Sequence, residues 1–123
     1  MRQDEKDKLL TLFEKQSQWC KHVEARDKRG QPVHYDDKTA VAWDLVGGMC
    51  FLFGWERACA LFKEVERHVS GLQRCRAARA PEMAAMAFLK DFNDKRDTTH
   101  NLIMAKLRGV PVQNRGRSQL AGS

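Results

Sequence analysis

The chain has 123 residues, of which 42% are hydrophobic and 31% are charged. This length suits one domain with a hydrophobic core, and the composition is typical of a globular protein rather than a disordered chain. The formal net charge of +6 is unevenly spread, since residues 1–66 carry a net charge of −1 and residues 67–123 carry +7. The basic half indicates an anionic partner, although a solubilising surface with a basic tail gives the same pattern.

The cysteines and the N-terminal segment indicate a reducing compartment. The spacings of Cys20, Cys50, Cys59 and Cys75 contain no C-x-x-C pair, so the zinc and thioredoxin patterns are absent. The first residues are charged and lack the apolar core of a secretion signal. We therefore expect reduced thiols and a cytoplasmic protein.

The first third of the chain is predicted to be one helix followed by a loop. Apolar residues at helical spacing predict a helix over residues 2–24. Gly30 and Pro32 then punctuate residues 25–35. This second segment is predicted to be an ordered loop or a short extended excursion.

The most apolar stretch, residues 36–54, is predicted to organise the fold. Asp44 is its only charge between Lys38 and Glu56, so we expect a buried central helix over about 37–53. Asp36 or Asp37 would cap its start, and a glycine at position 54 would end it. The apolar run is too short to span a bilayer, and a carboxylate within it would be costly there. We therefore expect no membrane partner.

Two features of this stretch call for an explanation. Glycine inside a helix costs on the order of 1 kcal/mol relative to alanine, so Gly47 and Gly48 predict the close approach of a neighbouring element or a kink. Backbone held open for a ligand is the alternative. Asp44 is either a tuned acid or base, or a carboxylate that is paired or that reaches the surface.

Three further helices are predicted after this stretch. The first covers residues 55–70 and runs antiparallel to the central helix or strongly bent against it. Residues 72–80 are an ambiguous connector, and Pro81 precedes a helix over 82–93. Asp97 or Thr98 would cap the last helix, which would run to Arg108. The residues expected inward on the 82–93 helix are Met83, Met86, Ala87 and either Leu89 or Phe92.

Together these elements predict an all-α fold. We expect a single-domain bundle of about five helices over residues 1–110, arranged around the central helix. Residues 111–123 have no periodicity and are predicted to form a flexible basic tail.

Motifs for chemistry are absent from the sequence. It contains no H-E-x-x-H, G-x-S-x-G, Walker or Rossmann pattern. We therefore expect no catalytic residue, metal site or cofactor, and no enzyme. A Cys–His pair assembled in space, such as Cys20 with His22 or His100, stays open because such pairs need not be close in sequence.

The basic second half supplies the candidate binding residues for a nucleic acid or an acidic partner. Clustered Arg and Lys release counterions from a phosphate backbone, which gives such a cluster its affinity. The candidates are Arg74, Arg76, Arg79, Lys106, Arg108, Arg115 and Arg117.

Three short motifs carry a resemblance to a known family. Residues 25–33 read A-R-D-x-x-G-x-P-V, residues 40–48 read A-x-A-W-x-L-x-G-G, and residues 92–94 read F-N-D, followed by Thr98 or Thr99 and a last helix. This combination resembles a family of small uncharacterised helical proteins from bacteria and phages. The chain departs from the family at Gly48, where Ala often follows the first Gly, and at Phe92, where Trp is usual.

The resemblance implies a helical fold and no particular activity. It implies that the motif residues form one constellation, to which we add the neighbouring carboxylate of Asp44. Its members would either cap and bridge chain ends, as Asn and Asp readily do, or line a small pocket. They are Arg26, Asp27, Trp43, Asp44, Asn93 and Asp94.

Three functions follow from the sequence. The leading prediction is a small non-enzymatic accessory or regulatory protein of phage or mobile-element origin. It would act by contact with another protein or with a second copy of itself in a homodimer. The alternative is a nucleic-acid-associated protein that uses its basic C-terminal half. The third is a small enzyme with a Cys or Asp in a pocket near Asp27, Asp44 and Asp94.

Overall fold

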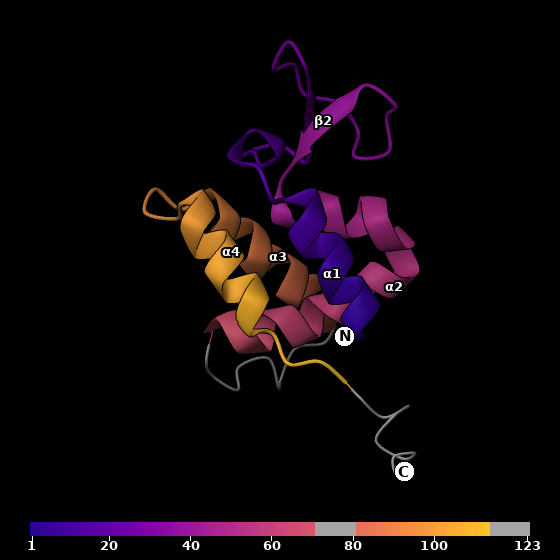
Figure 1. Cartoon of the computed structure of the whole chain (residues 1–123), viewed down its shortest axis with the longest axis vertical. Helices are drawn as coiled ribbons and strands as arrows, with labels where there is room; N and C mark the ends of the chain where they lie inside the picture. Colours follow the sequence, from indigo (N-terminus) through magenta and orange to yellow (C-terminus); the bar gives the residue numbers. More distant parts are fainter. Residues whose placement is uncertain (71–80, 114–123) are drawn as a thin grey trace.

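In a computed structural model of the chain, residues 1–70 and 81–113 are described. Their fold is mostly helical and carries a small two-stranded sheet, so the helical class is confirmed, whereas a purely all-α bundle of five helices is not. The helices pack into one body, and the sheet with its loops projects from one end of it (Figure 1). The elements are α1 (Gln3–Leu12), the 3₁₀ helix η1 (Gln16–Gln18), β1 (Ala25–Asp27), β2 (Ala40–Trp43), α2 (Leu45–Ser70), α3 (Pro81–Asp94) and α4 (His100–Gly109).

The central helix begins later than predicted, because residues 40–43 form strand β2. Asp37 does not cap a helix, since its Oδ1 accepts hydrogen bonds from the N–H and the hydroxyl of Thr39 at 2.8 and 2.7 Å. Val41 and Trp43 are residue types that favour strands. The cap of α2 is instead Asp44, whose Oδ1 accepts the Gly47 N–H at 2.5 Å. The predicted caps Asp36 and Asp37 are therefore wrong.

The predicted extended excursion is confirmed as strand β1 and the turn after it. β1 pairs antiparallel with β2, and the register shifts so that Val41 has no partner of its own and forms a β-bulge. Asp27 organises the turn, since its Oδ1 accepts the N–H groups of Arg29 and Gln31, both at 2.9 Å. Gly30 completes the turn with φ of 81°.

The first helix is shorter than predicted, ending at Leu12 instead of continuing to residue 24. Trp19 forms a parallel bridge to Trp43, and the Cys20 N–H donates to the Trp43 carbonyl at 3.0 Å. These contacts require extended backbone at residues that carry helical apolar spacing in the sequence. Tertiary pairing therefore overrides the local pattern here.

Helix α2 bends at Gly54, which has φ of 82° and ψ of 161°. This conformation is essentially restricted to glycine, so the glycine at position 54 determines where the helix bends. The break at Gly54 and the strongly bent helix over residues 55–70 are confirmed as the second half of α2. In Figure 1 this half runs across the end of the body opposite to the sheet.

Within the described residues, α2 is one helix whose length and composition would allow it to cross a membrane. Its 26 residues include a window that is half buried inside the protein. The core helix of a soluble protein meets the same criteria, so this finding is weak evidence for a membrane span.

The glycine pair at the start of α2 marks a close approach, as one of the two interpretations predicted. A Cβ atom on Gly47 would lie 2.2 Å from the carbonyl oxygen of Glu24. A Cβ atom on Gly48 would lie 2.4 Å from Cζ of Phe13, whose ring is fully buried. The backbone of α2 therefore touches the loop before β1 and the end of α1 directly.

The inward face of helix α3 was predicted only in part, since Leu89 is buried as predicted and Met86 is partly buried against the core. Ala85, Leu89 and Asn93 are buried at a spacing of four residues, whereas Met83 and Ala87 are exposed. The prediction placed Met83 and Ala87 inward because it had no reason to put a polar Asn93 in the core.

The cap of helix α4 also lies beside the predicted residues. Its cap is Thr99, whose hydroxyl accepts the Leu102 N–H at 3.2 Å, instead of Asp97 or Thr98. The hydroxyl of Thr98 donates to the Phe92 carbonyl at 2.7 Å. This second bond holds the turn between α3 and α4.

A partly buried ion pair joins α1 to the second half of α2. The carboxylate of Glu5 accepts bonds from Arg57 Nε at 2.7 Å and Nη2 at 2.8 Å, and from the Arg2 N–H at 2.9 Å. The Arg57 hydrogen bonds lower the pKa of Glu5 from 4.5 to about 2. The contribution of this ion pair to the free energy of unfolding is therefore complete above pH 4.5, and it is lost as the pH falls towards 2.

Candidate functional site

The residues of the predicted motif constellation surround one irregular segment, residues 19–24, which we call the 19–24 segment. It has no helix and joins η1 to β1. Its main chain is bonded to β2, since Cys20 N–H donates to Trp43 O and the Asp44 N–H donates to Glu24 O at 3.2 Å. The start of α2 and the end of β2 therefore lie against this segment.

Asn93 is the most completely bonded member of the constellation. Its Oδ1 accepts Trp19 Nε1–H at 2.7 Å and the Leu45 N–H at 3.0 Å. Its Nδ2 donates to Cys20 O at 3.1 Å and to Asp94 Oδ1 at 3.0 Å. All four bonding positions of the amide are used, and the residue is fully buried. Asn93 thus joins α3, α2 and the 19–24 segment.

Asp94 and Arg26 hold the middle of the same segment. Asp94 Oδ1 accepts the His22 N–H at 2.8 Å, and His22 has φ of 74°, which is uncommon for a residue with a Cβ atom. Arg26 Nη2 donates to Lys21 O at 3.2 Å. The structure therefore brings Arg26, Trp43, Asp44, Asn93 and Asp94 together around the segment, while Asp27 lies in the turn beyond it.

Asp44 is buried at the centre of this network. Its side chain is 2% exposed, and Lys90 Nζ lies 3.9 Å from its Oδ2. Burial raises the pKa of Asp44 from 3.8 to about 6, and the negative charges of Asp94 and Glu24 also raise it. The bond from Gly47 N–H and the charge of Lys90 lower this pKa only in part. The carboxylate of Asp44 therefore faces the interior of the protein.

We expect Asp44 to lower the stability of the protein as the pH rises. Because the folded-state pKa of about 6 lies above the ordinary value of 3.8, ionisation opposes folding between these pH values. Asp44→Asn keeps an oxygen for the Gly47 N–H and removes the charge. Relative to Asp44→Asn, the free energy of unfolding of the wild type should fall by about 3 kcal/mol as the pH rises from about 3.5 to about 7. This pH range brackets the two pKa values.

Urea denaturation of both proteins across this pH range measures the effect. Asp91→Asn, on an exposed position of α3, is the matched control. A difference between wild type and Asp44→Asn that does not change with pH would contradict the burial of an ionising Asp44.

The thiols of the described cysteines are not activated. Burial raises the pKa of Cys20 to about 11 and that of Cys50 to about 12, and it also raises the pKa of Cys59. A nucleophilic cysteine requires the opposite shift. His100, considered with Cys20 above, places its Nε2 2.6 Å from the carbonyl oxygen of Phe13.

Of the predicted basic residues, Lys106 and Arg108 lie in the described part of the chain. Both occupy the last turn of α4, where a cation complements the negative end of the helix dipole. Lys6 adds to this site by donating to the carbonyls of Arg108 and Val110 at 2.5 and 2.8 Å. The others, Arg74, Arg76, Arg79, Arg115 and Arg117, lie outside the described residues.

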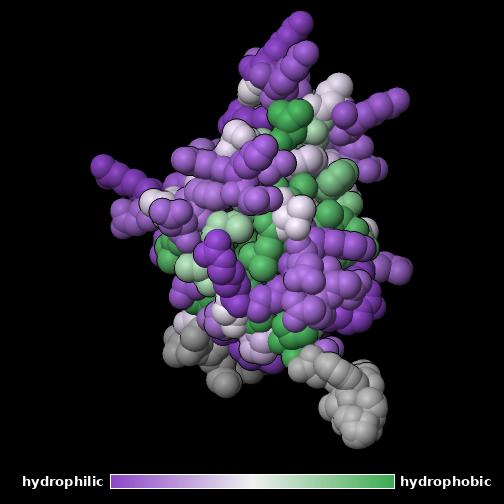
Figure 2. Space-filling view, viewed as in Figure 1, coloured by the Kyte–Doolittle hydropathy of each residue, from purple (hydrophilic) through white to green (hydrophobic). Residues whose placement is uncertain are grey.

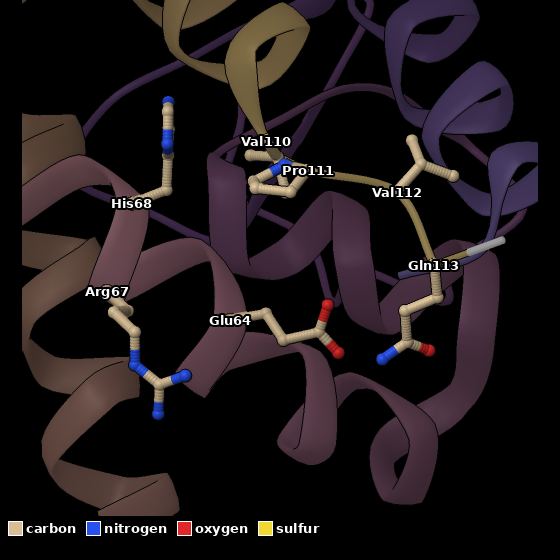
Figure 3. A pocket seen from close by; sticks show the side chains of 7 residues that line it. All are labelled: Glu64, Arg67, His68, Val110, Pro111, Val112 and Gln113. Carbon is tan, nitrogen blue, oxygen red and sulfur yellow. The ribbon is translucent and has the colours of Figure 1, made fainter. Parts of the chain in front are cut away.

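A pocket of about 350 Å³ lies between α2 and the segment that follows α4. Glu64, Arg67 and His68 come from α2, and residues 110–113 cross opposite them (Figure 3). Glu64 is also bonded to the N-terminal amine of Met1, whose carbonyl accepts the Gln113 N–H at 2.8 Å. The pocket therefore borders the contact that joins the two ends of the described chain.

An exposed aromatic surface flanks the bend in α2. Phe51 is 41% exposed and Trp55 is 47% exposed. Phe51 stacks on Trp43 with ring centroids 4.7 Å apart, and Trp55 meets the edge of buried Phe62 at 6.2 Å. Hydrophobic side chains reach the surface beside the first half of α2 and at the end of the molecule that carries the sheet (Figure 2). We call Phe51 and Trp55 the aromatic surface.

An apolar groove of about 310 Å³ lies between α1 and α2. Leu12 and Leu52 form its apolar wall, and Asp7 and Lys8 stand at its rim. Leu52 is the residue of α2 that lines this groove, and neither Phe51 nor Trp55 lines it.

The sequence analysis missed the aromatic surface and the 19–24 segment. It assigned Phe51 to a buried helix because the surrounding stretch is apolar, and it assigned Trp19 and Cys20 to the first helix. No local signal in the sequence distinguishes the exposed Phe51 and Trp55 from their buried neighbours.

Comparison with protein-family models, curated proteins and solved structures finds no match for this chain. The family resemblance of the three motifs therefore stays a prediction, and function is argued from the geometry alone.

Proposed function

We propose that this protein is a small helical binding module that acts by contact with another protein. The observation that carries the proposal is the aromatic surface, where Phe51 and Trp55 expose about half of each side chain. Aromatic residues, and Trp above all, supply much of the binding energy of protein interfaces. The exposure of two aromatic side chains of this size supports a docking role.

The aromatic surface is held rigidly, which favours binding. Phe51 rests on Trp43, whose Nε1–H donates to the Tyr35 carbonyl at 3.0 Å. Trp55 rests on Phe62, a fully buried core residue. Side chains that are already fixed lose little conformational entropy when a partner covers them.

Charge complementarity with a nucleic acid remains the alternative proposal. It relies on the basic C-terminal half, of which Lys106 and Arg108 are the described members. Both have a structural role at the end of α4, so they support the alternative less than the aromatic surface supports protein contact. A second copy of the chain is one partner that the aromatic surface would fit.

Substitution on the aromatic surface tests the proposed function. We expect Phe51→Ser with Trp55→Ser to reduce recovery of a cross-linked partner by about tenfold or more, because loss of an interface hot spot costs about 2 kcal/mol or more. Cross-linking of the full chain in extracts of its native host, followed by mass spectrometry, measures recovery. Sedimentation of the purified chain identifies a homodimer.

Met83→Ser is the matched control, since Met83 is an exposed apolar residue on α3. Circular dichroism verifies that each variant is folded. Recovery of the same partners at wild-type yield by the folded double variant would overturn the proposal.

A further inference from the structure

A second surface, separate from Phe51 and Trp55, is a groove of about 570 Å³ over the small sheet. The segment around η1 forms one wall through Lys15 and Trp19. The turn after β1 forms the other wall through Lys28. Arg26 and Ala42, which are directly paired across β1 and β2, share the sheet face that the groove covers.

The groove carries an excess of positive charge. Arg26 donates to two carbonyl oxygens, those of Gly30 at 2.8 Å and Lys21 at 3.2 Å. Neutral carbonyls orient the guanidinium and leave its charge uncompensated. Within residues 1–70 and 81–113, neither Arg26 nor Lys15 nor Lys28 forms an ion pair.

Among the described residues, Asp27 is the one carboxylate that lines the groove. Its Oδ1 already accepts two main-chain N–H groups of the turn. This acid is therefore held in place by the turn and leaves a net positive lining.

The groove also offers an apolar contact. Val41, the bulged residue of β2, is 45% exposed and lines the groove together with Ala42. A bulge turns a side chain out of the regular alternation of a strand. A small aliphatic side chain of a ligand can therefore pack against Val41, beside the three cations of the groove.

We propose that this groove binds a short extended acidic segment of a partner protein. A carboxylate of that segment meets Arg26, which keeps N–H groups that its bonds to the Gly30 and Lys21 carbonyls do not use. Lys15 and Lys28 attract further acidic residues, and a small apolar side chain rests on Val41. The inference rests on the proposed function in that the partner is a protein, and it adds the chemistry that the partner must carry.

A peptide fits the groove better than a single-stranded nucleic acid does. Bases bind such proteins by stacking on open aromatic rings. The indole of Trp19 is already engaged, since its Nε1–H is bonded to Asn93 and Lys21 Nζ lies 5.5 Å from its ring centroid.

Fluorescence anisotropy with a labelled peptide of alternating Glu and Val tests the inference on the full chain. We expect saturable binding at low salt. Lys15→Glu with Lys28→Glu should weaken it about tenfold or more, because like charges then face the peptide. Lys38→Glu with Lys95→Glu changes the net charge equally at exposed sites that do not line the groove, and it should keep the affinity within about twofold.

Three outcomes would overturn the inference: no saturable binding by the wild type, equal weakening by both double variants, or tighter binding of oligothymidylate at the same site. Circular dichroism of each variant excludes loss of fold as the cause. Failure of the peptide to bind leaves the Phe51 and Trp55 test unaffected. Conversely, the groove result stands if that test fails.

Discussion

Gly47→Ala should lower the free energy of unfolding by roughly 3 kcal/mol or more, the upper range for overpacking a well-packed site. The added Cβ atom would lie 2.2 Å from the main-chain oxygen of Glu24. That oxygen accepts the Asp44 N–H, so moving it aside breaks the bond that joins the 19–24 segment to the start of α2. Alanine's better helix propensity returns only about 1 kcal/mol. Thermal and urea denaturation measure the loss.

Gly48→Ala supplies the comparison for this result. Its Cβ atom would meet the ring of Phe13, with Cζ at 2.4 Å, instead of main chain. Phe13→Leu removes the ring and should therefore recover part of the stability of Gly48→Ala, while it should not recover Gly47→Ala. A double-mutant cycle separates the two cases. A melting curve of Gly47→Ala identical to that of the wild type would refute the close approach.

Asn93→Leu is expected to destabilise the protein by roughly 3–6 kcal/mol, because each buried polar group left without a partner costs about 1–3 kcal/mol. The near-isosteric side chain leaves the Trp19 indole N–H, the Leu45 N–H and the Cys20 carbonyl without their bonds. Small domains have only about 5–15 kcal/mol of stability in total. Urea denaturation followed by tryptophan fluorescence measures the change.

Asn101→Leu is the matched control, since it makes the same chemical change at an exposed position of α4. It should change the free energy of unfolding by less than about 0.5 kcal/mol, as surface substitutions usually do. A loss below about 1 kcal/mol for Asn93→Leu would show that water or a rearranged loop replaces the amide.

The helices could be predicted where one local signal was decisive. Pro81 marks the start of α3, and Gly54 marks the bend of α2, because each residue type allows few alternatives there. The glycine pair predicted a close approach for the same reason. The neighbours at that approach, Phe13 and the main chain of Glu24, could not be predicted because they come from distant parts of the chain.

Strand β2 and the 19–24 segment could not be predicted because their causes are not local. Trp19 belongs to a helical apolar pattern in the sequence, yet its main chain pairs with Trp43 and its indole bonds to Asn93. Similarly, apolar spacing alone cannot show that Ala40–Trp43 is a strand and that only Leu45 begins the helix.

The motif residues were singled out by resemblance, and the structure shows what holds them near one another. Asn93 and Asp94 bridge chain segments, and Asp44 caps α2. The aromatic surface lies within a stretch that was predicted to be buried. It could not be predicted because the exposure of a side chain depends on which other elements pack against it. For the basic groove, Arg26 and Lys28 lie close together in the sequence, but nothing in the sequence places Lys15 in the same groove.

The bonds to the 19–24 segment also bear on the order in which the chain folds. The bond from Asn93 to Cys20 spans 73 residues, and that from His22 to Asp94 spans 72. Closing such long loops costs entropy before any contact repays it, so these bonds cannot form early. We therefore expect the segment to acquire its final shape only after α3 has docked, later than the local turns of the chain.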